Sequence, residues 1–217
     1  MAHALLQMGV TLGTALQEDL PHPDYVAPPP WSEEKLHVTY ITHTRKNSLT
    51  ESDKQTINLH IDQLIQEQPP KTTLFTDGSV DQQTTVSACG FVTGETTAAY
   101  RLSNGASSMQ TEMAAIWKAL QHAADSEDNK DFIIITDSKS SIEALMQPVG
   151  CDNIKLHTSV LAALQQLHRQ QRSVQLVWTP SHIGVEGNEA ADRAANEGLA
   201  LPRPTISVAQ SISSIKA

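Results

Sequence analysis

The sequence has few cysteines, few aromatic residues, no long apolar run and no excess of positive charge. Its two cysteines, Cys89 and Cys151, have neither the spacing of metal ligands nor the density of a disulfide scaffold, so we expect two reduced thiols. No stretch approaches the roughly 18–20 apolar residues of a membrane span. The N-terminus also has no basic segment followed by an apolar one. These absences predict an intracellular protein that is neither secreted nor membrane-bound.

The charge balance argues against a basic surface for nucleic acid. The chain has 15 Lys and Arg against 24 Asp and Glu, a formal charge of −9. Residues 1–70 hold 4 basic and 9 acidic residues, and residues 71–217 hold 11 and 15. Two bound divalent cations would bring the second segment close to neutrality. A nucleic-acid partner is therefore compatible with this composition if cations are bound, and we expect it to be held weakly.

Length and proline placement predict one catalytic domain with an extension. At 217 residues and 39% hydrophobic, the chain can bury one core of ordinary size. Residues 1–20 have weak helical periodicity, and the prolines between residues 21 and 30 predict an extended linker. We divide the chain into a connector at 1–70, a catalytic domain at 71–200 and a disordered tail at 201–217.

Hydrophobic periodicity predicts an α/β fold. Within the connector it indicates a strand at 36–42 and a helix capped by Thr50 or Ser52. From residue 71 the predicted order is βββαβααβα, and the first three strands are expected to be antiparallel. The predicted strands lie at 72–76, 86–93, 96–102, 131–136 and 174–178. The predicted helices lie near 109–120, 139–146 and 154–169, and in an alanine-rich segment ending at about 200. The apolar run at 132–135 is typical of a buried parallel strand.

Four acidic motifs follow one another in the predicted catalytic domain. They are Thr76-Asp77-Gly78-Ser79, Glu112 in a helical stretch, Thr136-Asp137-Ser138, and the segment 181–192 that holds His182, Asn188, Glu189 and Asp192. We place Asp77 and Asp137 at the ends of adjacent strands, with Gly78 letting the chain leave the first one. Such carboxylates meet at one rim of a sheet, where sites of α/β proteins are usually found.

This set of residues suits the hydrolysis of a phosphodiester. The reaction needs a nucleophilic water, a stabilised leaving oxygen and neutralised phosphate charge, which two Mg²⁺ ions can supply together. Mg²⁺ prefers hard oxygen ligands such as carboxylates. Asn188 and Glu189 share a helix face with Asp192. Gly184 and Gly187 predict a mobile loop that could swing the imidazole of His182 in and out.

Each motif also has a simpler structural explanation. A Thr-Asp-Gly-Ser segment alone is usually a turn after a strand, and Asp137 alone could cap the next helix. Glu112 alone would be a solvated helix residue, and His182 alone a loop histidine. These explanations are independent of one another, so the occurrence of all four motifs in this order favours the two-metal nuclease.

The motifs closely resemble those of ribonuclease H of type 1, over residues 71–200. The resemblance implies a five-stranded mixed sheet, three antiparallel strands followed by two parallel ones, flanked by helices. It implies cleavage of the RNA strand of an RNA–DNA hybrid to give 3′-hydroxyl and 5′-phosphate ends, with two Mg²⁺ ions or Mn²⁺ in their place. It assigns catalysis and metal binding to Asp77, Glu112, Asp137 and Asp192. His182 takes the role of the family's flexible-loop histidine, in proton transfer or product departure.

Departures from the family pattern bear on the substrate. Ser108 and Met109 stand where cellular members have paired asparagines, and Lys139 stands where a glutamine is common. With Gly78, Ser79 and Asn188 they are our candidates for substrate contacts. The segment 152–172 is too short and too weakly basic for the substrate handle of some cellular enzymes.

Residues 28–31 and the strand and helix after them resemble the connector before the ribonuclease H domain in reverse transcriptases of non-long-terminal-repeat retrotransposons. No polymerase motif is present, so a partner reverse transcriptase would be encoded elsewhere or have belonged to a longer ancestral polyprotein. One rival function is a transposase, integrase or resolvase of the same fold, against which the histidine loop argues. The other is a catalytically inactive hybrid-binding module, which predicts the loss of a carboxylate, and none is missing.

Overall fold

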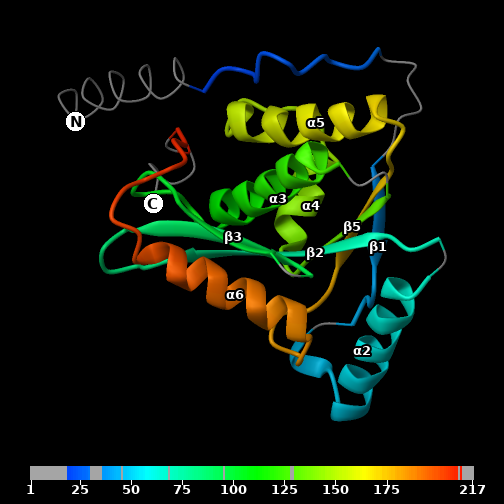
Figure 1. Cartoon of the computed structure of the whole chain (residues 1–217). Helices are drawn as coiled ribbons and strands as arrows, with labels where there is room; N and C mark the ends of the chain where they lie inside the picture. The colour runs from blue at the N-terminus through cyan, green and yellow to red at the C-terminus, as the bar shows by residue number, and fades with distance from the viewer. Residues whose placement is uncertain are drawn as a thin grey trace.

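The computed structural model describes residues 19–29, 36–44, 46–67, 69–94, 96–127, 130–209 and 211. The periodicity at residues 1–20 falls almost wholly outside this part. Within it, a mixed β-sheet lies between two layers of helices (Figure 1). The elements are β1 (His37–Tyr40), η1 (Lys46–Ser48), α2 (Glu51–Ile65), β2 (Thr72–Val80), β3 (Ser87–Thr93), β4 (Thr96–Arg101), α3 (Ser108–Asp125), β5 (Phe132–Thr136), α4 (Lys139–Leu145), α5 (Ile154–Arg169), β6 (Val174–Trp178) and α6 (Glu186–Leu199).

The sheet has six strands rather than the predicted five, in the order β1-β6-β5-β2-β3-β4. β2, β3 and β4 are antiparallel neighbours, whereas β1, β6, β5 and β2 run parallel. The additional strand is β1, which pairs with β6 from His37 opposite Gln175 to Tyr40 opposite Trp178. Its residues were expected to form a strand, but a local pattern does not identify the neighbour that a strand joins.

One face of the sheet is covered by α3, α4 and α5 (Figure 1). α3 begins at a capping box formed by Ser107 and Gln110. Every residue of β5 is buried, as expected for a central parallel strand covered on both faces. The core on this side joins strand and helix residues that include Leu74, Ile134, Leu176, Met113, Leu120 and Val160.

No helix among the described residues is long and apolar enough to cross a membrane.

The opposite face is covered by α6 and α2 (Figure 1). α2 begins where the Thr50 side chain accepts a hydrogen bond from the Asp53 backbone, while the Asp53 carboxylate accepts one from the Thr50 backbone. Its apolar side packs against the sheet in a second core, which joins Ile57, Ile61, Leu64, Ile133, Ile135, Val177, Ile183 and Val185. α2 is thus part of the same folded unit as the sheet.

A segment before β1 caps the N-terminal end of α5. The α5 N-cap residue, Asn153, has a left-handed backbone and gives no side-chain cap bond. The Asp19 carboxylate takes its place, because it accepts hydrogen bonds of 2.8 Å from both Ile154 N and Lys155 N. A carboxylate at this end satisfies backbone donors that the helix leaves unpaired. The cap therefore comes from a residue far away in the sequence.

The residues after α6 pack beside β4. Thr205 N and Ile206 N donate to Arg101 O, and the Ile206 side chain is buried. The Ser211 hydroxyl donates to Asp152 Oδ2 at 2.6 Å. The sequence predicts a disordered tail from residue 201, whereas residues 201–209 and 211 have these specific contacts. The domain limits at residues 70 and 200 stay predictions.

Candidate metal and catalytic site

Asp77 lies inside β2, at the point where the neighbouring strand ends. β5 pairs with β2 only as far as Thr136 opposite Thr76, while β2 continues against β3 to Val80. The expectation that the first strand ends at Asp77 is therefore wrong. Asp77 still lies at the rim of the parallel part of the sheet, because β5 stops beside it.

Gly78 has a packing role rather than the role of releasing the chain from the sheet. A Cβ atom at this position would lie 2.5 Å from both Glu112 N and Thr111 Oγ1. β2 and α3 therefore touch through their backbones here, which only glycine allows. This close approach brings the side chain of Glu112 next to that of Asp77.

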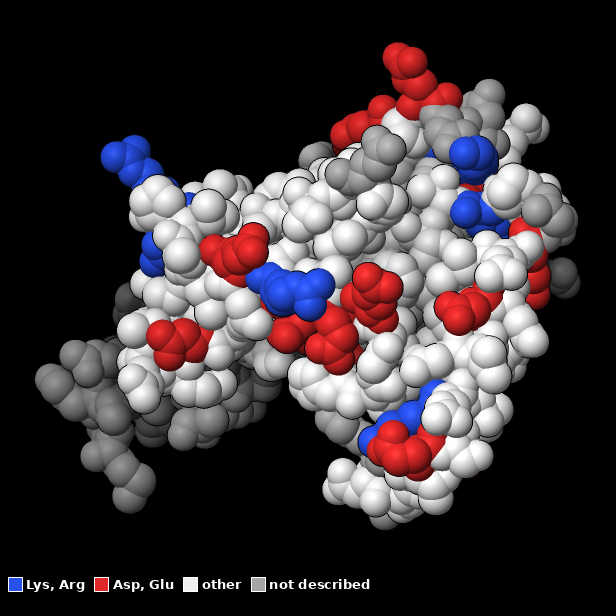
Figure 2. Space-filling view, turned by 60° about the horizontal axis from the view of Figure 1, so that its bottom comes forward, with Lys and Arg blue, Asp and Glu red and all other residues white. Residues whose placement is uncertain are grey.

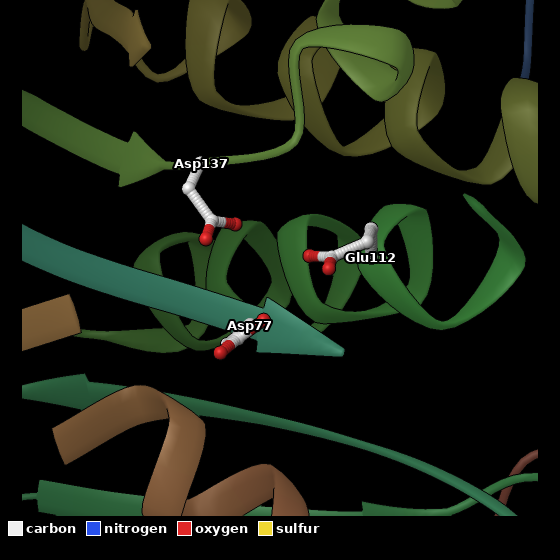
Figure 3. A group of neighbouring side chains, drawn as sticks. All are labelled: Asp77, Glu112 and Asp137. Atoms are coloured by element: carbon white, nitrogen blue, oxygen red, sulfur yellow. The ribbon is translucent and has the colours of Figure 1, made fainter. Parts of the chain in front are cut away.

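Three carboxylates converge from three elements. Asp77 comes from β2, Glu112 from α3, and Asp137 from the residue that follows β5. Their side-chain oxygens lie within 4.8 Å of one another, and Figure 3 shows the three groups pointing into a common space. The cap of α4 is Ser138, whose side chain accepts a hydrogen bond from Ser141 N. Asp137 is thus not needed as a helix cap.

Asp77 and Glu112 retain protons more strongly than isolated acids, because both have a raised pKa. Burial is the largest cause that raises the pKa of Asp77 to about 7, followed by the charge of Asp137. Burial also raises the pKa of Glu112 well above its ordinary value, with the charge of Asp77 as the next cause. Without cations, this pair therefore holds a proton near neutral pH.

The three groups fit a hard divalent cation. All offer carboxylate oxygens, which are the ligands that Mg²⁺ prefers. Glu112 Oε2 is buried and has no hydrogen-bond partner among the residues that the structure describes. A buried polar atom without a partner is costly, and a cation would supply the missing partner together with the positive charge that the cluster lacks.

α6 brings a fourth carboxylate to the edge of this group. Asp192 is close enough to contribute to the raised pKa of Asp77, although it is not one of the three within 4.8 Å. Asn196, one turn further, donates from Nδ2 to Asp192 Oδ1 at 3.0 Å and accepts from the Ser79 hydroxyl at 2.6 Å. Asp192 is therefore tied through Asn196 to the strand that carries Asp77.

The loop before α6 presents His182 at the surface. His182 is exposed and has a left-handed backbone with φ +53°. Gly184 is also left-handed, with φ +87°. Gly187 was expected to loosen this loop, but it belongs to the first turn of α6, where a Cβ atom would lie 2.3 Å from the Phe75 ring. Gly187 lets the helix approach the sheet and does not act as a hinge.

The remaining substrate candidates differ in their surroundings. Ser108 is exposed at the start of α3, and Met109 beside it is partly buried. The Lys139 Nζ atom lies 3.5 Å from Glu143 Oε1, and its side chain is about half exposed. Asn188, in the first turns of α6, has both side-chain amide atoms buried without a hydrogen-bond partner. Their contacts with a substrate stay predictions.

Two supporting residues could not be identified from the sequence motifs. The Trp178 indole N–H donates to the Asp137 carbonyl oxygen at 3.0 Å, which fixes the backbone that carries this carboxylate. Asn196 hydrogen-bonds Asp192. Its position four residues after Asp192 in a predicted helix was the one sequence feature that could have indicated this contact.

The molecular surface agrees with the charge balance. On the face shown in Figure 2, the lysines and arginines that the structure describes lie singly or in small groups among acidic residues. No continuous basic area is visible among them on this face. On this face, positive charge for a polyanionic partner would therefore have to come largely from bound cations.

Comparison with protein families gives a match over most of this architecture. A family model described as RNase H matches residues 69–200. The matched segment begins just before β2 and ends just after α6, so it contains Asp77, Glu112, Asp137 and Asp192. It leaves out β1 and α2.

Proposed function

Because the chain belongs to the ribonuclease H family, we propose that it is a metal-dependent endonuclease that hydrolyses the RNA strand of RNA–DNA hybrids. The observation that carries this proposal is the convergence of Asp77, Glu112 and Asp137 within 4.8 Å. Carboxylates that repel one another and shift each other's pKa are costly, and such clusters are concentrated at functional sites. A nuclease that uses cations gives all three a role.

Two Mg²⁺ ions, or Mn²⁺ in their place, would generate the nucleophilic water and neutralise charge on the phosphate. Asp77 and Asp137 would hold the ions at the rim of the sheet, with Glu112 and Asp192 completing the set of ligands. Binding of the ions would displace the protons that the raised pKa values of Asp77 and Glu112 favour. Trp178 and Asn196 keep Asp137 and Asp192 in place through the hydrogen bonds described above. The products would carry 3′-hydroxyl and 5′-phosphate ends.

His182 is assigned to proton transfer or product departure. Its imidazole is exposed in the loop that leads into α6, the helix that carries Asp192. An exposed imidazole can exchange protons with solvent, as a group that assists proton transfer must. It is therefore expected to assist the reaction without being a ligand.

Binding of the hybrid is expected to be weak and sensitive to salt, because basic side chains are sparse. The substrate contacts that we propose are those of Gly78, Ser79, Ser108, Met109, Lys139 and Asn188. A retrotransposon origin, an associated reverse transcriptase and an intracellular location also remain proposals. The family match does not include the connector residues that suggested the first two.

The test is incubation of the purified chain with end-labelled RNA–DNA hybrid, RNA duplex and single-stranded RNA, each with Mg²⁺, Mn²⁺ or chelator. We expect cleavage of the RNA strand of the hybrid alone, dependent on the cation and absent in Asp137→Asn. Product ends are read by their susceptibility to phosphatase and polymerase extension. Binding of hybrid without cleavage in any cation would instead favour the inactive hybrid-binding module.

A further inference from the structure

α2 lies outside the segment matched by the family model, yet it packs directly on the loop that presents His182. Ile183 is 5% exposed and Val185 is 7% exposed. Both belong to the apolar cluster formed with Ile57 and Ile61 of α2. Figure 1 shows α2 beside the end of α6 at which this loop enters the helix. The side chains on either side of Gly184 are therefore anchored on an element from the extension.

Asn58 adds a polar contact to this apolar anchor. Its Nδ2 atom donates to the Ile183 carbonyl oxygen at 3.2 Å, across 125 residues of sequence. A Cβ atom at Gly184 would lie 3.8 Å from Asn58 Nδ2. Asn58 thus lies beside the peptide group that joins Ile183 and Gly184.

The backbone of this loop needs such support. His182 has φ +53°, in the left-handed region that residues with a side chain seldom adopt, and Gly184 follows with φ +87°. A left-handed conformation of a non-glycine residue persists only where the surrounding structure enforces it. The buried Ile183 side chain holds the loop against α2. The hydrogen bond from Asn58 to the Ile183 carbonyl fixes the orientation of the peptide plane.

We propose that Asn58 is a positioning residue for His182, acting through the Ile183 carbonyl to hold the loop in the conformation that presents the imidazole to the site. The effect on cleavage rests on the proposed function, since it requires that His182 take part in the reaction. The anchoring of the loop does not. On this proposal, α2 contributes to catalysis without contacting substrate or cation.

The test compares Asn58→Ala with Leu59→Ala in the full chain. Leu59 is the next residue of the same helix and is 62% exposed, so its substitution controls for changes in helix propensity. One hydrogen bond of this kind shifts a loop equilibrium by about 10-fold or less. We therefore expect Asn58→Ala to lower kcat by about 3–10-fold with little change in KM, and Leu59→Ala to change neither. Asn58→Asp keeps the side-chain shape but replaces the donor with a carboxylate oxygen that repels the Ile183 carbonyl, so its loss of kcat should be at least as large as that of Asn58→Ala.

The decisive arm combines these variants with His182→Ala. If Asn58 acts through His182, Asn58→Ala causes no further loss of kcat when the imidazole is already absent. An equal loss in both backgrounds would overturn the proposal, because it would mean that Asn58 supports the site or the fold generally.

Amide hydrogen exchange tests the anchoring without reference to activity. Exchange at Ile183, Gly184 and Val185 should become faster in Asn58→Ala and stay unchanged in Leu59→Ala. Unchanged exchange in Asn58→Ala would reject the anchoring. A wild-type chain that cleaves no hybrid would reject the proposed function, and the exchange result would then decide the anchoring alone.

Discussion

Residues 69–200 and residues 36–65 use the same sheet in different ways. The first segment matches the family model and supplies all the carboxylates of the candidate site. The second adds β1 to the edge of the sheet and α2 to one face, and supplies none of them. The second segment is the less buried of the two, since β1 has no fully buried residue and α2 has three, whereas every residue of β5 is buried. An edge and a face of the sheet can thus be extended while the strand ends that form the site keep their arrangement.

The comparison predicts that the largest loss of activity arises in the matched segment. Asp77→Asn keeps the side-chain shape but removes the negative charge, so cleavage should fall by more than about 10³-fold. The circular dichroism spectrum and the melting profile should show a folded protein, and hybrid binding should be retained or improved. Normal cleavage by a folded variant would reject the two-metal assignment.

His182→Ala should have a smaller effect. An exposed imidazole that assists proton movement contributes on the order of 10²-fold, whereas losing a ligand removes the cation that activates the reaction. Single-turnover rates measured beside Asp77→Asn give the ranking. If both variants were equally inactive, His182 would also be needed for the structure of the site and not only for proton transfer.

The extension should contribute mainly to stability. Ile61→Ala removes a buried side chain and is expected to lower the free energy of unfolding by about 2–4 kcal/mol in urea titrations. Leu59→Ala is the matched control, and its exposed side chain should change stability by less than about 0.5 kcal/mol. Below the melting temperature, Ile61→Ala should reduce the cleavage rate no more than His182→Ala does. A larger loss would show that α2 shapes the carboxylate cluster itself.

The smallest effect concerns the stability of the cation-free protein as a function of pH. Burial raises the pKa of Asp77 to about 7 in the folded chain, above its ordinary value of 3.8. The stability that comes from binding this proton is complete below about pH 4 and is lost as the pH rises through about 7. Asp77→Asn resembles the protonated form and avoids this loss.

In chelator, the difference in unfolding free energy between Asp77→Asn and the wild type should therefore grow with pH. We expect almost no difference at about pH 4 and an advantage for the variant on the order of 2 kcal/mol at about pH 8. Added Mg²⁺ should reverse it by stabilising the wild type alone. Parallel stability curves at all pH values would contradict the raised pKa.

The local elements were predictable where the periodicity is long and regular. The predicted bounds of α5 and β6 agree with the structure, because Leu156, Val160 and Leu167 recur at helical spacing and a strand pattern follows. The motif order also predicted three carboxylates that the structure brings together. Periodicity within single elements and the order of the motifs were sufficient for these predictions.

Contacts between distant segments could not be predicted in the same way. The pairing of β1 with β6, the Asp19 cap on α5 and the Asn58 bond to the His182 loop each join residues more than 100 positions apart. Gly78 was interpreted as a residue that lets the strand end, since a glycine in a sequence does not reveal which backbone approaches it. These features depend on packing that only the folded chain defines.

Gly78 also determines how the site can change over generations. Because β2 and α3 touch there through their main chains, the spacing between Asp77 and Glu112 is set by two backbones and not by a side chain packed between them. Apolar residues deeper under α3 can then be substituted while the two carboxylates keep their separation. A methyl group at position 78 would push α3 away from β2 and separate Asp77 from Glu112. The geometry of this acidic pair therefore requires glycine at position 78.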